Sequence, residues 1–192
     1  MSLFFETLRV IDGKIQNLHY HNIRLNHTIQ ANFGIDAKID LRTYIQQTNP
    51  NQERCKVLYE NTIKEVQFFT LTPRKVQSLK VLHHNITYNF KNADREEIDK
   101  LFHKREGCDD ILLIKDGLVT DTSIANIAYH DGTHWITPKS PLLLGTMRAS
   151  LIEKQLLLEK DVKIKDIKKA TRFALMNALI GFQEVKGLNI AF

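Results

Sequence analysis

Residues 88–95 read Tyr-Asn-Phe-Lys-Asn-Ala-Asp-Arg and contain the lysine around which the rest of the chain is organised. Lys91 follows an apolar, β-prone run over residues 86–90 and precedes a helical pattern over residues 94–104. A lysine at such a strand-to-helix junction can face a cleft that removes its charge and leaves a nucleophilic amine. A solvated lysine in a polar turn is the alternative interpretation, because lysine usually lies at the surface. Features elsewhere in the chain distinguish the two.

The composition is that of a globular protein with a hydrophobic core. The chain has 192 residues, 43% of them hydrophobic, which allows one domain or two small domains that share an interface. No apolar run reaches the roughly 18 residues of a membrane span. Residues 1–5 are followed too soon by Glu6 and Arg9 to be a signal peptide. Cys55 and Cys108 show no metal spacing, so we expect reduced thiols in a cytoplasmic protein.

The net charge of +5 allows a nucleic acid, an anionic substrate or no specific partner. The densest basic run, residues 163–169, has no stacking aromatic residues nearby, and we therefore expect no nucleic-acid binding. The spacing of the histidines predicts no metal site, and we expect these side chains in packing positions or at the surface. The histidines in question are His19, His21, His83 and His84.

The first half of the chain is predicted to be an α+β unit. A strand over residues 4–10, a tight turn at Asp12-Gly13 and a return strand over residues 14–18 form a hairpin. A helix begins near Asn17, which is a possible cap, and ends at Gly34. The remaining elements expected here are a short helix over residues 40–47 and strands over residues 54–60, 66–71 and 78–83.

The second half is predicted to be rich in strands, with hairpin turns at Asp116-Gly117 and Asp131-Gly132. We place the boundary near Asn85, which gives domains 1–85 and 86–192. The expected strands are 110–115, 118–120, 124–130, 135–137, 162–164, 173–176 and 184–188, and the expected helices are 94–104, 147–158 and 166–170.

Four separate segments carry the side chains that pyridoxal phosphate requires. A lysine, Lys91, can form an imine with the cofactor, and an acid between two strands, Asp121, can keep the ring nitrogen protonated so that the ring accepts electrons. Arg24 on an early helix and the helix start at Gly145 can hold the phosphate through a guanidinium and backbone amides.

These segments resemble the class IV aminotransferases, the fold-type IV pyridoxal phosphate enzymes. Residues 5–13 are similar to the family's Phe-Glu-Thr hairpin, and residues 21–25 to the segment whose arginine holds the phosphate. Residues 91–95 resemble the lysine segment, where the family often has Asn-Arg. Residues 145–148 resemble the Gly-Ile-Thr-Arg turn whose amides reach the phosphate. The four similarities occur in the family's order and extend over nearly the whole chain.

The resemblance implies one catalytic residue, Lys91, and a set of cofactor contacts. The expected cofactor-binding residues are Arg24, Lys91, Asp121, Asn126, Gly145, Thr146, Met147, Asn177 and Ala178. Thr146 and Met147 are expected to act through their backbone amides. Asn126 either satisfies a buried backbone group or orients Asp121. Asn177 either turns the chain or lies near the phosphate. The family usually has Glu at the ring nitrogen, and the shorter Asp121 is still expected to form that ion pair.

The implied function is a lyase that converts 4-amino-4-deoxychorismate to 4-aminobenzoate and pyruvate, a step toward folate. Residues 9–14 and 176–179 resemble the lyase more than the branched-chain enzymes of the family. Lys91 is expected to act as general base on the substrate amine's carbon. One alternative is an aminotransferase for D- or branched-chain amino acids. Another is a non-catalytic cofactor-binding protein, since the chain is expected to lack the family's segment before the hairpin and to be short between its halves.

The architecture implied by the resemblance is an α/β protein like D-amino acid aminotransferase. Its N-terminal half is α+β, its C-terminal half has a barrel-like sheet, and the cofactor lies in the cleft between them. A homodimer that acts on a small-molecule amine, away from membranes, is also implied.

Overall fold

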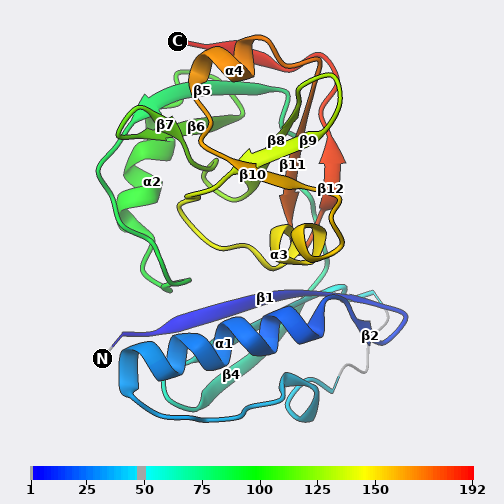
Figure 1. Ribbon diagram of the computed structural model, residues 1–192. Helices are drawn as coiled ribbons and strands as arrows, with labels where there is room; N and C mark the ends of the chain where they lie inside the picture. Colours follow the sequence, from blue (N-terminus) through cyan, green and yellow to red (C-terminus); the bar gives the residue numbers. More distant parts are fainter. Residues whose placement is uncertain (1, 47–50) are drawn as a thin grey trace. The chain divides into compact units, whose positions relative to one another are not determined.

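The computed structural model describes residues 2–46 and 51–192, which form two compact units (Figure 1). The first unit contains Met1–Pro73 and Phe90–Asp94, and the second contains Arg74–Asn89 and Arg95–Phe192. The chain therefore passes between the units three times. The boundary placed near Asn85 lies inside the second unit, and the segment with Lys91 belongs to the first.

The first unit is a four-stranded antiparallel sheet with a long helix on one face. Its elements are β1 (Phe4–Ile11), β2 (Lys14–Ile15), α1 (Leu18–Phe33), the 3-10 turn η1 (Leu41–Thr43), β3 (Arg54–Tyr59) and β4 (Ile63–Phe69). The strand order is β2-β1-β3-β4. Alternate residues of β1, such as Phe4 and Leu8, pack in one core with Leu25 and Ile29 of α1. This alternation explains why the strand and the helix stay together.

Local signals predicted most of this unit correctly. The β1–β2 hairpin turns through Asp12 and Gly13, which both have positive φ, as a two-residue hairpin turn requires. Gly34 ends α1 in the left-handed conformation, and its N–H donates to the Gln30 carbonyl. Asn17 precedes α1 without a side-chain capping bond. The short helix expected over residues 40–47 is only the single turn η1 among the described residues 40–46, and Gln47 lies outside the described residues.

The second unit combines two sheets and three helices. Its elements are β5 (Ser78–His83), α2 (Glu96–His103), β6 (Asp110–Lys115), β7 (Leu118–Val119), β8 (Asn126–His130), β9 (Trp135–Pro138), α3 (Thr146–Glu153), β10 (Leu158–Lys160), α4 (Ile164–Lys168), β11 (Arg172–Asn177), β12 (Gly181–Glu184) and β13 (Asn189–Ala191). The strand orders are β10-β9-β8-β11-β12 and β13-β5-β6-β7.

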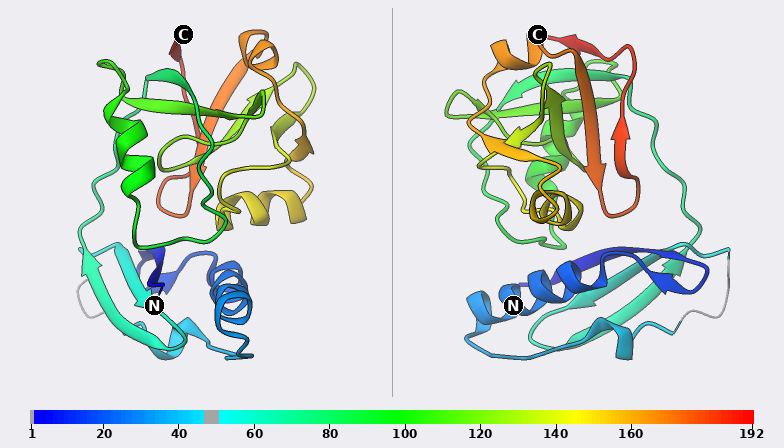
Figure 2. Two further views of the ribbon diagram at one scale, coloured as in Figure 1. Left: turned by 90° about the vertical axis from the view of Figure 1, so that its left-hand side faces the viewer. Right: turned by 45° about the vertical axis from the view of Figure 1, so that its right-hand side comes forward.

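The two sheets of this unit curl around one shared core (Figure 2). Leu79 of β5 and Leu112 of β6 in one sheet pack with Ile127 of β8 and Leu175 of β11 in the other. The predicted barrel-like C-terminal half is thereby confirmed. Within the described residues, no helix is long and apolar enough to cross a bilayer.

Three predicted elements in the second unit differ from the observed ones. The helix expected over residues 147–158 ends at Glu153, because Gln155 adopts a positive φ that a helix cannot continue, and β10 follows. The strand expected over residues 162–164 is absent, since Val162 is buried in the core as part of a loop before α4. The strand expected over residues 184–188 is wrong except at Glu184, because residues 185–188 form a turn with positive φ at Gly187 between β12 and β13.

Candidate functional site

The lysine segment is held by β1. Residues 84–91 form no strand, so the expectation that Lys91 stands at a strand end is wrong. Tyr88 packs in a core of the second unit, whereas Phe90 packs in the core of the first. The apolar run therefore serves two cores instead of alternate faces of one strand. The Lys91 carbonyl accepts the N–H of Phe5 at 2.9 Å, and Lys91 Nζ lies 4.5 Å from the centre of the Phe5 ring.

A buried charge pair fixes Arg24 on α1. Glu6 of β1 accepts a hydrogen bond from Arg24 Nε at 2.8 Å and another from Arg24 Nη2. His21, one turn before Arg24, places Nδ1 2.6 Å from Glu6 Oε2, and both Glu6 and His21 are fully buried. The sequence motif that contains Glu6 and the motif that contains Arg24 are therefore in direct contact in the folded protein.

The electrostatics of this group favour charged Glu6 and Arg24 beside neutral His21. Burial tends to raise the pKa of Glu6, but Arg24 and the bond to His21 outweigh it and lower the pKa to about 2. Burial lowers the pKa of His21, with Arg24 and Lys91 acting in the same direction and Glu6 opposing. Sequence reasoning missed the role of Glu6, although an acid on the same face of β1 as Phe4 and Leu8 was the available signal.

The acid of the second unit lies in the loop after β7 and is held by two hydrogen bonds. Asp121 is buried, its Oδ1 accepts Asn126 Nδ2 at 2.8 Å, and its Oδ2 accepts the N–H of Leu143 at 2.9 Å. Burial raises the pKa of Asp121 from 3.8 to about 7, and these bonds and Arg148 only partly oppose it. Among residues 2–46 and 51–192 no side chain forms an ion pair with Asp121.

Asn126 donates to both kinds of partner that were considered for it. Its Nδ2 donates to Asp121 Oδ1 and also to the Leu143 carbonyl, at 2.8 Å in each case. Asn126 is therefore bonded both to Asp121 and to the carbonyl of the half-buried Leu143.

Gly145 is required by the position of Asn126. A Cβ built on Gly145 would lie 2.0 Å from Asn126 Oδ1, and Asn126 cannot withdraw without losing its bonds. Gly145 is also the residue before α3, and it provides no side-chain cap for the helix. The N-terminus of α3, with Thr146 and Met147 in its first turn, is an electropositive end of the kind that binds phosphate.

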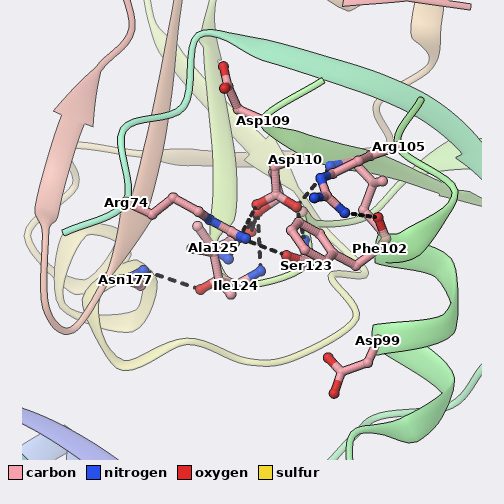
Figure 3. Close-up of polar contacts among 12 residues, drawn as sticks. Arg74, Asp99, Phe102, Arg105, Asp109, Asp110, Ser123, Ile124, Ala125 and Asn177 are labelled. Carbon is pink, nitrogen blue, oxygen red and sulfur yellow. Dashed lines mark hydrogen bonds and ion pairs between the residues drawn. The ribbon is translucent and has the colours of Figure 1, made fainter. Parts of the chain in front are cut away.

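Asn177, at the end of β11, turns the chain and contacts the acid's loop. Its Oδ1 accepts the N–H groups of Leu179 and Ile180, which shapes the turn that contains Ala178. Its Nδ2 donates to the Ile124 carbonyl at 3.2 Å (Figure 3). A cofactor contact of Asn177 or Ala178 stays a prediction.

The predicted site residues fall into two groups, one on each unit. Lys91 and Arg24 belong to the first unit, and Lys91 influences the His21 side chain that shares Glu6 with Arg24. The second unit brings Asp121, Asn126 and residues 143–147 together through the bonds described above. The first group contains an amine and an arginine, and the second contains a buried acid and a helix N-terminus.

The fold and these two groups define a class of protein. The sequence profile of the amino-transferase class IV family matches residues 70–188, which include Lys91, Asp121 and Gly145. The chain belongs to this family of enzymes and has the fold-type IV architecture. Membership in a family of enzymes argues against the alternative of a non-catalytic cofactor-binding protein.

Individual relatives are similar over almost the whole chain. An uncharacterized protein from Haemophilus influenzae is 36% identical over 183 residues, which are 92% of this chain and 97% of that protein. A crystal structure from Haemophilus somnus, provisionally assigned as a 4-amino-4-deoxychorismate lyase, is 29% identical with a TM-score of 0.83 and covers 94% of this chain and 98% of its own. The pyridoxal phosphate-bound form of a hypothetical aminotransferase from Mycobacterium tuberculosis shares the fold, at 17% identity, a TM-score of 0.74 and coverage of 97% and 81%.

Proposed function

We propose that this protein is a pyridoxal phosphate-dependent lyase that converts 4-amino-4-deoxychorismate to 4-aminobenzoate and pyruvate. The observation that carries the cofactor assignment is the buried carboxylate of Asp121. It has two hydrogen bonds and a pKa raised to about 7, and no cation is paired with it among the described residues. A protonated ring nitrogen is the partner that such a carboxylate suits. The similarity to the Haemophilus somnus protein supports the lyase assignment.

The remaining residues fit the rest of that cofactor. Arg24 is oriented by its two hydrogen bonds to Glu6, which suits an arginine that binds a phosphate dianion. The α3 N-terminus, brought close to Asn126 by Gly145, suits the same phosphate through backbone amides. Lys91 is the amine on the first unit that would bind the aldehyde.

The chemistry divides among these side chains as follows. When bound, pyridoxal phosphate supplies an electron sink for the substrate's amine-bearing carbon. Asp121 holds a proton at the ring nitrogen and thereby maintains the sink. Lys91 Nζ would take the proton from the substrate's amine-bearing carbon as general base. Loss of the enolpyruvyl group then makes the six-membered ring of the substrate aromatic, which drives the lyase reaction.

The test is a titration of the purified protein with pyridoxal phosphate, followed by an assay for 4-aminobenzoate. We expect a new absorbance band that free cofactor lacks, and release of 4-aminobenzoate from the substrate. Absence of the band in the wild-type protein would contradict the cofactor assignment. A band without 4-aminobenzoate release would contradict the lyase assignment alone.

An aminotransferase for D- or branched-chain amino acids is the second candidate, because the matching family is described as an amino-transferase class. Lys91 would have the same role as general base in this function, and the amino group would pass to a 2-oxo acid. Transfer of the amino group to 2-oxoglutarate, without formation of 4-aminobenzoate, would identify this function.

A further inference from the structure

The loop over residues 121–125, which contains the buried acid, is held at Ser123 by the side chains of Arg74, Arg95 and Asp110. Figure 3 shows Arg74 and Asp110 beside Ser123. Ser123 Oγ accepts a hydrogen bond from Arg74 Nη2 at 3.0 Å. The Ser123 N–H donates to Asp110 Oδ1 at 3.3 Å, and the Ser123 carbonyl accepts Arg95 Nη2 at 2.8 Å. The side-chain hydroxyl, the amide and the carbonyl of one loop residue are therefore each bound. We call Ser123 with Arg74, Arg95 and Asp110 the Ser123 clasp.

Asp110 connects the clasp to the sheet. It is the first residue of β6, a central strand, and it is fully buried. Its Oδ1 also accepts the N–H of Ile111 at 2.8 Å, and its Oδ2 accepts Arg74 Nη2 at 2.9 Å. The Arg74 guanidinium in turn lies 4.6 Å from the centre of the Phe102 ring of α2. Ser123 is thus fixed to rigid elements of the second unit.

The two arginines of the clasp each begin a segment of the second unit. Arg74 is the first residue of the second unit after Pro73, and Arg95 is the first after Asp94. Arg95 follows Lys91 by four residues, so the end of the lysine segment is tied to the loop that carries the acid. Two of the three chain crossings therefore enter the second unit on a residue that binds Ser123.

The loop itself transmits this attachment to the acid. Thr122 Oγ1 accepts the Ala125 N–H at 3.0 Å and the Thr122 N–H donates to the Ala125 carbonyl, which makes the loop compact. Only Thr122 separates Ser123 from Asp121. A shift of the Ser123 backbone would displace Asp121 from its bonds to Asn126 and Leu143.

We propose that the Ser123 clasp positions the Asp121 carboxylate for the cofactor. Arg74, Arg95 and Asp110 are positioning residues, since each acts on the cofactor through the loop. The proposal rests on the proposed role of Asp121 at the ring nitrogen, and its test therefore includes a measurement without cofactor.

The main test compares Asp110→Asn with Asp109→Asn. Asp109 is the neighbouring carboxylate, and its Oδ2 accepts the N–H groups of Gln77 and Ser78 and the Ser78 hydroxyl, with no bond to the loop. In cofactor-free protein, we expect Asp110→Asn to increase amide hydrogen exchange over residues 119–127, and Asp109→Asn to leave exchange there unchanged. With pyridoxal phosphate added, we expect Asp110→Asn to weaken cofactor binding at least about tenfold, and Asp109→Asn to leave the Kd as in wild type.

A second pair of variants tests the proposal even if Asp110→Asn does not fold. Arg95→Gln removes the bond to the Ser123 carbonyl, a 3.8 Å contact to Asp99 and the position of the guanidinium over the Tyr88 ring, 5.9 Å from its centre. Arg105→Gln is its control, because Arg105 stacks on Phe102 and binds the Phe102 carbonyl without contacting the loop. We expect Arg95→Gln, and not Arg105→Gln, to raise loop exchange and the cofactor Kd.

The outcomes separate the two proposals. Folded Asp110→Asn and Arg95→Gln proteins with wild-type loop exchange and wild-type Kd would overturn the clasp proposal, as would equal effects of the control variants. If the wild-type protein binds no cofactor, the proposed function fails. Unchanged exchange in the cofactor-free variants would then reject the clasp independently.

Discussion

Asp121→Asn should change how the stability of the cofactor-free protein depends on pH. Burial disfavours the charged form of the Asp121 carboxyl and raises its pKa from an ordinary value of 3.8 to about 7 in the folded protein. Between these values the unfolded chain releases the proton and the folded protein keeps it. Stability therefore falls as pH rises through this window and levels off above about pH 7. The full difference corresponds to about 4 kcal/mol.

The measurement is urea unfolding of cofactor-free wild type and Asp121→Asn at several pH values. From about pH 5 to about pH 8, wild type should lose roughly 3 kcal/mol relative to the variant. Taking the difference between the two proteins cancels the other titrating groups. These include Glu6, whose stabilisation is lost as pH falls from 4.5 toward about 2, and His21, whose lowered pKa makes stability fall in acid.

The slope with pH is the decisive quantity, because the variant also loses a hydrogen bond. The amide at position 121 would face one of two donors, Asn126 Nδ2 or the Leu143 N–H, with its own N–H groups. The lost hydrogen bond should lower the free energy of unfolding by about 1–3 kcal/mol at every pH. Asp109→Asn is the matched control, since the pKa of Asp109 is lowered by its bonds to Gln77 and Ser78. A difference between wild type and Asp121→Asn that stays flat from about pH 5 to about pH 8 would refute the reasoning.

The other predictions concern residues of both units. Gly145→Ala should destabilise the protein by about 1–3 kcal/mol in urea unfolding, because its Cβ would meet Asn126 Oδ1, and the double variant Gly145→Ala/Asn126→Ala should show less than the sum of the single costs. Glu6→Gln leaves the Arg24 charge without its carboxylate and should lower the free energy of unfolding by about 2–4 kcal/mol. The variant should also bind the cofactor more weakly in an absorbance titration. An unchanged free energy of unfolding together with an unchanged cofactor Kd would contradict the assigned pair. Lys91→Ala should abolish the absorbance band of bound cofactor while its melting temperature stays close to that of wild type, and a band that persists would exclude Lys91 as the attachment point.

Elements with local signals could be predicted from the sequence. The β1–β2 hairpin needs two residues that tolerate positive φ, and Asp12-Gly13 supplies them; the end of α1 is set in the same way by Gly34. The strand over Ser78–His83 was predicted with its observed bounds. The order of the motifs along the chain also indicated the family, which the match over residues 70–188 confirms.

Contacts between distant residues decided what the sequence by itself did not. The run over residues 86–90 alternates like a strand, yet Tyr88 and Phe90 are buried in different cores, and no pattern within five residues reveals which core each side chain joins. Glu6 contacts Arg24 because strand alternation and helix periodicity bring both side chains to one interface. Gly145 is needed because Asn126, which lies earlier in the chain, occupies the space that a Cβ at position 145 would take. Backbone preferences act over a few residues and are readable in order, whereas burial and hydrogen bonding depend on which segments pack together, and that is known only once the chain is folded.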